Sequence, residues 1–213
     1  MLNYKKTIII SIKEQKLMLI EDNYKIAEYP ISSSKFGLGN KTGSNMTPLG
    51  YHKINEKLGD HAHINSIYKN GKFTDKIATV NGKYNEKESV ITTRIIKLEG
   101  LENNINKGGE VDSLKREIWI HGTPFENKIG TPASHGCIRM KNEDIILLYN
   151  SIEINTYLNI VIQDLTKFNT KNSLYTKRDH GFRLQDRRKK GVLDSTLWKF
   201  NNVERRKKSE RRK

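Results

Sequence analysis

The chain has 213 residues, of which 35% are hydrophobic and 30% are charged. This amount of apolar sequence supports one core and argues against two. The net charge is +15, but residues 167–213 alone hold 17 Lys or Arg against 5 Asp or Glu. The rest of the chain is therefore nearly neutral, which excludes a protein that binds nucleic acid over its whole surface.

The first part of the chain predicts strands. Residues 7–12 are mostly β-branched, and the apolar segments 16–20 and 26–31 follow after polar turns. Residues 32–50 are rich in Gly, Ser, Asn and Lys, which predicts a loop. Residues 51–89 are polar, with few apolar runs, and predict short strands joined by long loops.

The second part of the chain predicts three more strands and one helix. Residues 90–98, 117–121 and 157–162 have the apolar or alternating pattern of strands. Asn142 predicts the N-cap of a short helix, since acidic residues follow it at once. The apolar face of this helix would consist of Ile145, Leu148 and Tyr149.

These elements predict a mostly β domain over residues 1–166, with a short helix after Cys137. Residues 167–213 predict a basic, partly disordered extension. An alternative function for this extension is contact with an anionic partner, such as nucleic acid, anionic lipid or an acidic wall polymer.

No targeting segment is visible at the start of the sequence, and no apolar run approaches transmembrane length. The default expectation is therefore a cytoplasmic location. The alternative is an exported protein, in the periplasm or the cell wall, because a missing or trimmed leader would look the same.

Cys137 is the only cysteine, so the chain forms no internal disulfide. A thiol becomes a useful nucleophile when an imidazole assists its ionisation. His135 precedes it by two residues, and His121 ends a predicted strand. Of the two, His121 is the better general base because a neighbouring strand can hold it in place. The Gly122 carbonyl would then orient the ring.

Three further residues around Cys137 fit an acyl-transfer site. Gly136 permits an unusual backbone conformation, so its amide and that of Cys137 are expected to point at a developing oxyanion. Arg139 carries a planar, permanent charge that suits a substrate carboxylate. Ser134 begins the run Ser134-His135-Gly136-Cys137-Ile138-Arg139.

Less specific interpretations exist for Cys137 and for three other histidines. Most free cysteines are small buried hydrophobes, but two histidines, a glycine and an arginine around this one favour a catalytic role. The histidines His52, His61 and His63 would be a minimal zinc site, but no cysteine or carboxylate pattern joins them. The sequence therefore predicts no metal and no cofactor.

The runs His121-Gly122-Thr123-Pro124 and Ser134 to Met140 closely resemble the signature of L,D-transpeptidase catalytic domains of the YkuD type. Thr47-Pro48-Leu49-Gly50 also resembles a segment of that family. The resemblance covers about residues 5–165 and implies a largely β fold, described as a sandwich or barrel, and a substrate in peptidoglycan stem peptides.

The resemblance implies a role for each matching residue. Cys137 would be the nucleophile, His121 the base and Gly122 the carbonyl that orients it. His135 and Gly136 would line the oxyanion side, Ser134 would support the loop, and Arg139 would contact a carboxylate.

Three functions remain open at this point. A transpeptidase would form 3→3 cross-links by passing a thioester to an amine. An L,D-carboxypeptidase would release terminal D-alanine to water during peptidoglycan recycling. A non-enzymatic protein that binds an anionic polymer would use mainly the basic extension.

Overall fold

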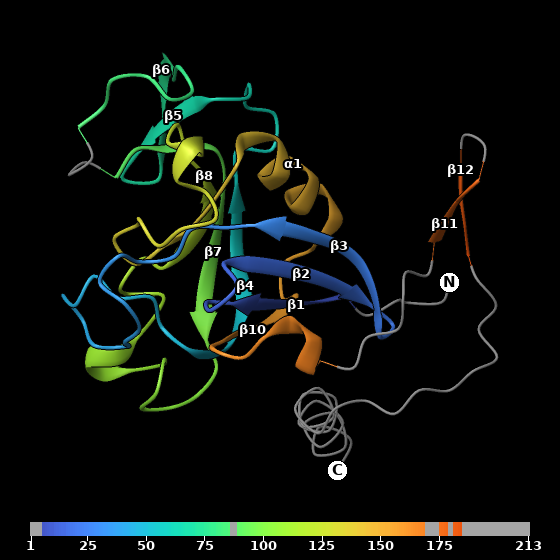
Figure 1. Cartoon of the computed structure of the whole chain (residues 1–213). Helices are drawn as coiled ribbons and strands as arrows, with labels where there is room; N and C mark the ends of the chain where they lie inside the picture. Colours follow the sequence, from blue (N-terminus) through green and yellow to red (C-terminus); the bar gives the residue numbers. More distant parts are fainter. Residues whose placement is uncertain (1–5, 86–88, 169–174, 179–180, 185–213) are drawn as a thin grey trace, which may run out of the picture.

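The computed structural model describes residues 6–85, 89–168, 175–178 and 181–184 (Figure 1). Ten strands form one sheet: β1 (Lys6–Ser11), β2 (Lys16–Glu21), β3 (Tyr24–Pro30), β4 (Gly50–Leu58), β5 (Ser66–Lys69), β6 (Lys72–Ile77), β7 (Ile91–Gly100), β8 (Trp119–Gly122), β9 (Ile138–Met140) and β10 (Tyr157–Val161). The helix α1 (Asn142–Ser151) follows β9, and single 3-10 turns lie at Gly109–Val111, Glu126–Lys128 and Leu165–Lys167.

The strands are ordered β3-β2-β1-β10-β4-β7-β5-β6, and β8 pairs with both β7 and β9. The pairs β1–β10 and β8–β9 are parallel, and the other pairs are antiparallel. The prediction of a mostly β fold with one short helix after Cys137 is confirmed. Because β8 and β9 branch from β7, the sheet has a short parallel pair beside its long antiparallel part.

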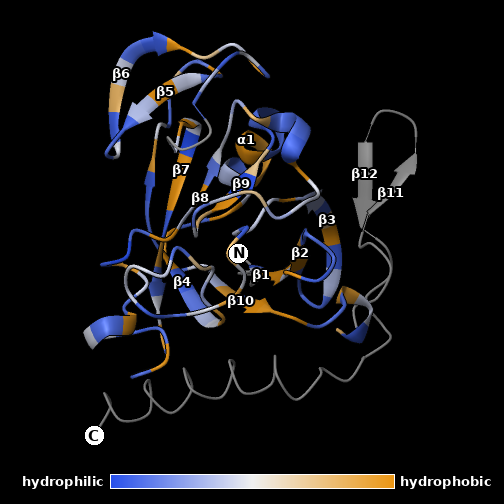
Figure 2. Ribbon diagram, turned by 60° about the vertical axis from the view of Figure 1, so that its left-hand side comes forward, coloured by the Kyte–Doolittle hydropathy of each residue, from blue (hydrophilic) through white to orange (hydrophobic). Residues whose placement is uncertain are grey.

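The main core lies on one face of this sheet and is closed by α1. Strand alternation places Ile8 and Ile10 of β1 there, together with Ile120 of β8. Ile145 and Leu148 of α1 are completely buried against the same cluster. Figure 2 shows hydrophobic residues along β1, β10 and β7, whereas the β5–β6 hairpin is mostly hydrophilic.

A second apolar cluster covers the other face of β1 and β2. Ile9, Met18 and Ile20 point to this side and are covered by Leu165 and Phe168. Both covering side chains are buried, with 6% of their surface exposed. The packing of the body therefore extends to Phe168, two residues past the boundary expected from composition.

The structure corrects the predicted role of Asn142. The residue before it, Lys141, occupies the N-cap position, and Asn142 is the first residue of α1. The Asn142 side chain instead donates to the Thr123 carbonyl and the Glu126 carboxylate. Glu126 Oε1 also accepts the backbone N–H of Asn142 at 2.8 Å, so a carboxylate from a distant loop caps the helix.

Two short strands of the basic extension are described, β11 (Tyr175–Arg178) and β12 (Gly181–Leu184), and they pair antiparallel. The basic runs of residues 187–190, 205–208 and 211–213 lie outside the described residues. The predictions of partial disorder and of an anionic partner for this extension therefore stay predictions. Among the described helices, none is long and apolar enough to cross a membrane.

Candidate active site

Two of the predicted site residues, His121 and Arg139, lie on the face of β8 and β9 that is turned away from the main core. In the parallel β8–β9 pair, Ile120 lies opposite Ile138 and His121 lies opposite Arg139. The two isoleucines belong to the main core. Since side chains alternate along a strand, His121 and Arg139 point to the other face.

Cys137 is adjacent to this same face. It precedes β9 and packs against a third apolar cluster that includes Ile95 and Trp119. Trp119 and His121 are two residues apart on β8, so they share a face. The chain thus brings Cys137 and His121 onto one side of neighbouring strands, as the sequence predicted.

His121 is completely buried, and one hydrogen bond fixes the tautomer of its ring. Its Nδ1 lies 2.7 Å from the Gly122 carbonyl oxygen. A carbonyl only accepts hydrogen bonds, so Nδ1 carries the proton and Nε2 keeps its lone pair. In the described part of the chain, Nε2 has no hydrogen-bond partner. Burial, with a smaller effect of the Arg139 charge, lowers the pKa of His121 to about 4.

Cys137 is partly exposed, and its thiol donates to the Glu117 carbonyl at 3.3 Å. Burial raises the pKa of this thiol, and the Trp119 backbone N–H and the Arg139 charge act against that rise. Because the thiol pKa is raised and the imidazole pKa is lowered, both groups are neutral at pH 7. In the resting state Cys137 is therefore a thiol and His121 an imidazole with a free lone pair, rather than a thiolate and an imidazolium.

The loop before Cys137 is held by hydroxyl groups. Ser134 Oγ donates to the Cys137 carbonyl at 2.6 Å and accepts the Gly136 N–H at 3.2 Å. Thr47 Oγ1 donates to the Gly136 carbonyl at 2.9 Å. Gly136 has φ of 123°, a conformation that favours glycine.

These bonds correct one sequence-based expectation. The Gly136 amide was expected to point at an oxyanion, but in this structure it donates to Ser134 Oγ. The physical reason is that the Ser134 hydroxyl turns back into its own loop and satisfies the amide locally. The role expected of Ser134 as a support of the loop agrees with the same two bonds.

His135 lies beside the site and is far less enclosed than His121. Its ring centroid is 5.7 Å from that of Phe36. Burial and the charges of Lys35 and Arg139 lower its pKa, so it too is neutral at pH 7. Like His121 Nε2, the Nδ1 atom of His135 is buried and has no hydrogen-bond partner among the described residues, but no backbone carbonyl fixes the tautomer of this ring.

Two polar residues near the site carried no recognisable signal in the sequence. Arg116 is close enough to Cys137 to act electrostatically on its thiol. Its guanidinium donates to the Met46 carbonyl at 2.7 Å, which holds the segment that precedes Thr47. Thr47 appeared in the sequence only within a family-like segment, with no role attached to it.

His52, His61 and His63 do not form a zinc site. His52 is completely buried on β4 and bonds the Gly50 carbonyl and the Ser113 hydroxyl. His61 and His63 are exposed in the turn before β5. Within the described ranges, no group of three or more His, Cys, Asp or Glu side chains is arranged to hold a metal ion.

Residues 5–162 match the sequence model of the L,D-transpeptidase catalytic domain, known as YkuD. The chain belongs to this family. The match spans the whole body, from β1 to β10, and includes every site residue named above.

Similarity to individual relatives is confined to a short stretch or has low sequence identity. The protein named Probable L,D-transpeptidase YbiS of Escherichia coli (strain K12) is 38% identical over 48 residues, which are 22% of this chain and 16% of that protein. A solved L,D-transpeptidase of Xylanimonas cellulosilytica DSM 15894 is 16% identical with a TM-score of 0.47, over 74% of this chain and 60% of that one. L,D-transpeptidase 3 of Mycobacterium tuberculosis is 14% identical with a TM-score of 0.46, over 74% and 61%. The chain therefore spans less than two thirds of each of these relatives.

Proposed function

We propose that this member of the L,D-transpeptidase family is a cysteine-dependent acyl-transfer enzyme that acts on peptidoglycan stem tetrapeptides. The donor bond joins the L-centre of the third residue, a diamino acid, to a terminal D-alanine. Cys137 takes the acyl group as a thioester, and an amine of a second stem then receives it in a 3→3 cross-link.

The observation that carries this proposal is the state of His121. Its Nδ1–H is bound to the Gly122 carbonyl, so the lone pair of Nε2 is available on the sheet face that Cys137 shares. A neutral base on the same sheet face as a neutral thiol suits a reaction in which the proton moves as sulfur attacks.

In the first half-reaction, the Cys137 proton passes to His121 Nε2 while Sγ bonds to the donor carbonyl carbon. The carbonyl electrons move to oxygen, and the loop of Ser134, His135 and Gly136 borders that oxygen. When the carbonyl re-forms, the C–N bond breaks and the leaving amine takes the proton from Nε2. The products are the thioester and free D-alanine.

In the second half-reaction, the acceptor attacks the thioester and gives a proton to His121. The C–S bond breaks, and the proton returns to Cys137. An amine acceptor gives the cross-link, and water gives a tripeptide. The first product defines an L,D-transpeptidase and the second an L,D-carboxypeptidase.

The test uses the purified full chain with a stem tetrapeptide, in the presence and absence of an acceptor amine. Mass spectrometry of the small products is expected to show D-alanine release in both reactions and a cross-linked dimer when the amine is present. Tripeptide as the main product even with the amine would replace the transpeptidase with a carboxypeptidase. Mass spectrometry of the protein is expected to show the acyl group on Cys137.

Two variants and one control test whether Cys137 is the nucleophile and His121 the general base. Cys137→Ala is expected to abolish release, and His121→Gln to lower kcat at least about 100-fold, as loss of a general base does. His61→Gln is the control because that side chain is 96% exposed and outside the site. Unchanged turnover in Cys137→Ala would refute the enzyme proposal.

A further inference from the structure

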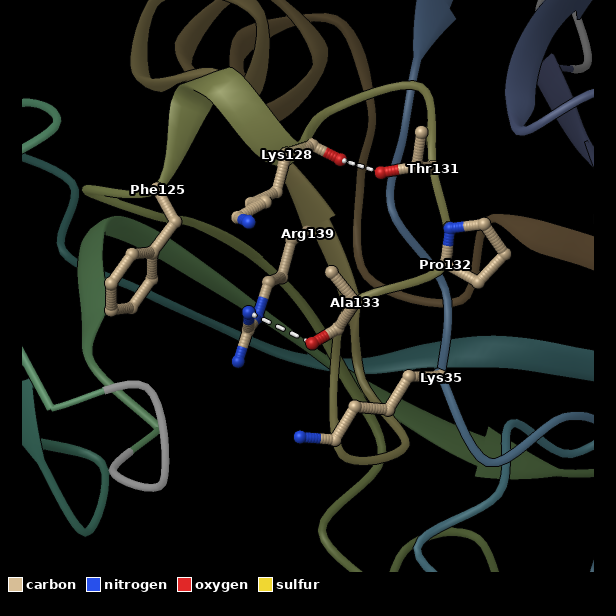
Figure 3. Close-up of a pocket in the computed structure, with 7 residues that line it drawn as sticks. All are labelled: Lys35, Phe125, Lys128, Thr131, Pro132, Ala133 and Arg139. Carbon is tan, nitrogen blue, oxygen red and sulfur yellow. Dashed lines mark hydrogen bonds between the residues drawn. The ribbon is translucent and has the colours of Figure 1, made fainter.

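Two arginine side chains act on the Cys137 thiol, and they come from different parts of the fold. Arg139, on β9, lines a pocket with a volume of about 260 Å³, which Figure 3 shows. The other lining residues are Lys35, Phe125, Lys128, Thr131, Pro132 and Ala133. Arg116 precedes β8 and lies outside that lining. The motif around Cys137 contains Arg139, whereas Arg116 approaches the thiol only through the fold.

The segment 116–118 lies directly against the loop of the nucleophile. The Glu117 carbonyl accepts the Cys137 thiol at 3.3 Å. A Cβ on Gly136 would come within 3.4 Å of Ile118 Cδ1, so these two residues are close neighbours. The segment therefore borders both the sulfur atom and the glycine that precedes Cys137.

The backbone of this segment is fixed in an unusual conformation. Glu117 has φ of 55°, which is uncommon for a residue with a side chain. The Asp112 carboxylate closes the turn before it by accepting three backbone N–H groups. The Arg116 N–H adds a bond to the Asp112 carbonyl at 2.9 Å. Together these bonds hold the Glu117 carbonyl in place at the thiol.

The Arg116 guanidinium reaches a second segment that borders the same loop. It donates to the Met46 carbonyl at 2.7 Å. A Cβ on Gly136 would lie 3.5 Å from that carbonyl oxygen. The next residue, Thr47, donates to the Gly136 carbonyl at 2.9 Å. Arg116 thus ties Met46 and Thr47 to the segment 116–118, and Gly136 lies close to both.

The positive charge of Arg116 has neutral hydrogen-bond partners. Besides Met46, its guanidinium donates to the Gly39 carbonyl at 3.3 Å and to the Ser44 hydroxyl at 3.4 Å. Among the residues that the structure describes, no carboxylate pairs with it. Burial lowers the pKa of Arg116, and the anionic form of Cys137 acts against that decrease. The thiolate is thus a negative charge that the guanidinium favours.

Other charged groups also face Cys137. Burial has the largest effect on the pKa of this thiol and raises it. The Glu117 charge raises this pKa too, and the charges of Arg139 and Arg116 lower it. His121 shares the sheet face but is neutral at pH 7 and above, because its pKa is about 4. A change of Arg116 alone therefore tests a charge that the motif does not supply.

We propose that Arg116 is a positioning residue for the nucleophile, because it fixes the backbone around Gly136 and favours negative charge on the Cys137 sulfur. This proposal rests on the function given above only in taking Cys137 as the nucleophile. As the proton leaves Sγ for His121 Nε2, the sulfur becomes negatively charged. A nearby cation lowers the free-energy cost of that step.

Alkylation of Cys137 tests the charge without any peptide. Iodoacetamide reacts with the thiolate, forming a C–S bond and releasing iodide, so its rate at pH 8 follows the ionised fraction of the thiol. Arg116→Gln is expected to slow this reaction about 10-fold, which corresponds to a rise of about one unit in the thiol pKa. Arg116→Met is a second neutral variant with the same expectation. Lys115→Gln is the charge-matched control, since Lys115 is exposed, and should change the rate less than about 2-fold.

A second reagent separates charge from shape. Iodoacetate reacts in the same way but is an anion, so its rate relative to that of iodoacetamide reports the positive charge near the thiol. This ratio is expected to fall about 3-fold in the two neutral variants and to be retained in Arg116→Lys. Unchanged rates in neutral variants that circular dichroism shows to be folded would overturn the proposal. Slower alkylation with an unchanged ratio would also overturn it, because a change of shape alone explains that result.

Turnover of the stem tetrapeptide separates this proposal from the proposed function. Arg116→Gln is expected to lower kcat about 10-fold and to leave KM within about 2-fold, because the charge acts on the chemical step. Alkylation that depends on Arg116 in a chain that releases no D-alanine would keep the role of Arg116 at the thiol and refute the proposed function. Unchanged kcat of Arg116→Gln in an active chain would refute the role of Arg116.

Discussion

His121 and His52 are both completely buried, and burial lowers the pKa of each to about 4. They differ in the second ring nitrogen. His52 Nε2 bonds the Ser113 hydroxyl, whereas His121 Nε2 has no partner among the described residues. A buried nitrogen without a partner is costly, so a protein retains one mainly where a ligand or a reaction uses it. The sequence ranked His121 first by its place at a strand end, but only the structure shows this difference.

The lowered pKa of His121 predicts the acid limb of the activity profile. A base with a pKa of about 4 stays neutral on lowering the pH from 7.5 to 5.5, so kcat/KM should remain nearly constant over this range. A base with the usual histidine pKa would retain only about 10% of its neutral form at pH 5.5. Activity is expected to fall only as the pH approaches 4, where His121 takes up a proton and can no longer accept one from Cys137.

The measurement is the rate of D-alanine release between pH 4.5 and 8, with circular dichroism at each pH to confirm that the chain is folded. A half-maximal rate near pH 6.5 would contradict the assignment of His121 as the base.

At the scale of the elements, the strongest sequence signals were the continuous apolar runs. The runs at 7–12 and 16–20 correspond to β1 and β2, whose central residues are buried on both faces. The sequence predicted only short strands and long loops for residues 51–89, which contain most of β4. Burial is confined to His52 and Ile54, and the charged residues Lys53, Glu56 and Lys57 are partly exposed. A strand buried on one face only offers half the apolar signal.

The start of α1 depends on a residue that sequence rules assigned to another role. The carbonyl oxygen of the Asn142 side chain accepts bonds from the hydroxyls of Thr92 and Thr93, and its amide donates to the Thr123 carbonyl. An N-cap rule considers only the helix itself, so it cannot anticipate partners on β7 and after β8. Asn142 thus joins the helix to β7 and to Thr123, the residue that directly follows the strand carrying His121.

Asn142→Ala is expected to destabilise the fold by about 2–4 kcal/mol, since it leaves several buried polar groups without partners. Urea unfolding at pH 7 measures the change. Asn150→Ala, at an exposed position in the last turn of α1, is the control and should change stability by about 0.5 kcal/mol or less. Equal effects of the two substitutions would show that the network adds nothing.

For the whole molecule, the site depends on contacts between distant segments. Thr47 reaches Gly136 across 89 residues, and Lys35 and Arg139 line one pocket from opposite ends of the domain. The motif around Cys137 predicted the chemistry because its residues are close in sequence. The pocket could not be predicted in the same way, since Lys35 and Lys128 belong to loops with no pattern of their own.

The packing of Phe168 predicts where the chain can be shortened. A chain that ends at residue 168 keeps the cover over β1 and β2 and is expected to unfold at the same temperature as the full chain. A chain that ends at residue 164 loses Leu165 and Phe168 and is expected to lose about 3–5 kcal/mol, because two buried apolar side chains disappear.

Thermal unfolding of the two shortened chains and the full chain tests this. Loss of stability in the longer of the two would mean that part of the region beyond residue 168 packs on the body. D-alanine release by that chain also tests whether the basic extension matters for turnover of a small peptide.

The group that orients His121 is a backbone carbonyl, that of Gly122, and no side-chain substitution can delete it. A mutational scan would therefore never reveal this partner by its chemistry. Substitutions of Gly122 would lower activity for steric reasons, because a Cβ there would come within 2.6 Å of the Thr92 carbonyl oxygen. A single substitution therefore cannot remove the hydrogen-bond acceptor of His121 Nδ1. The tautomer of this histidine would change only if the backbone of the strand moved.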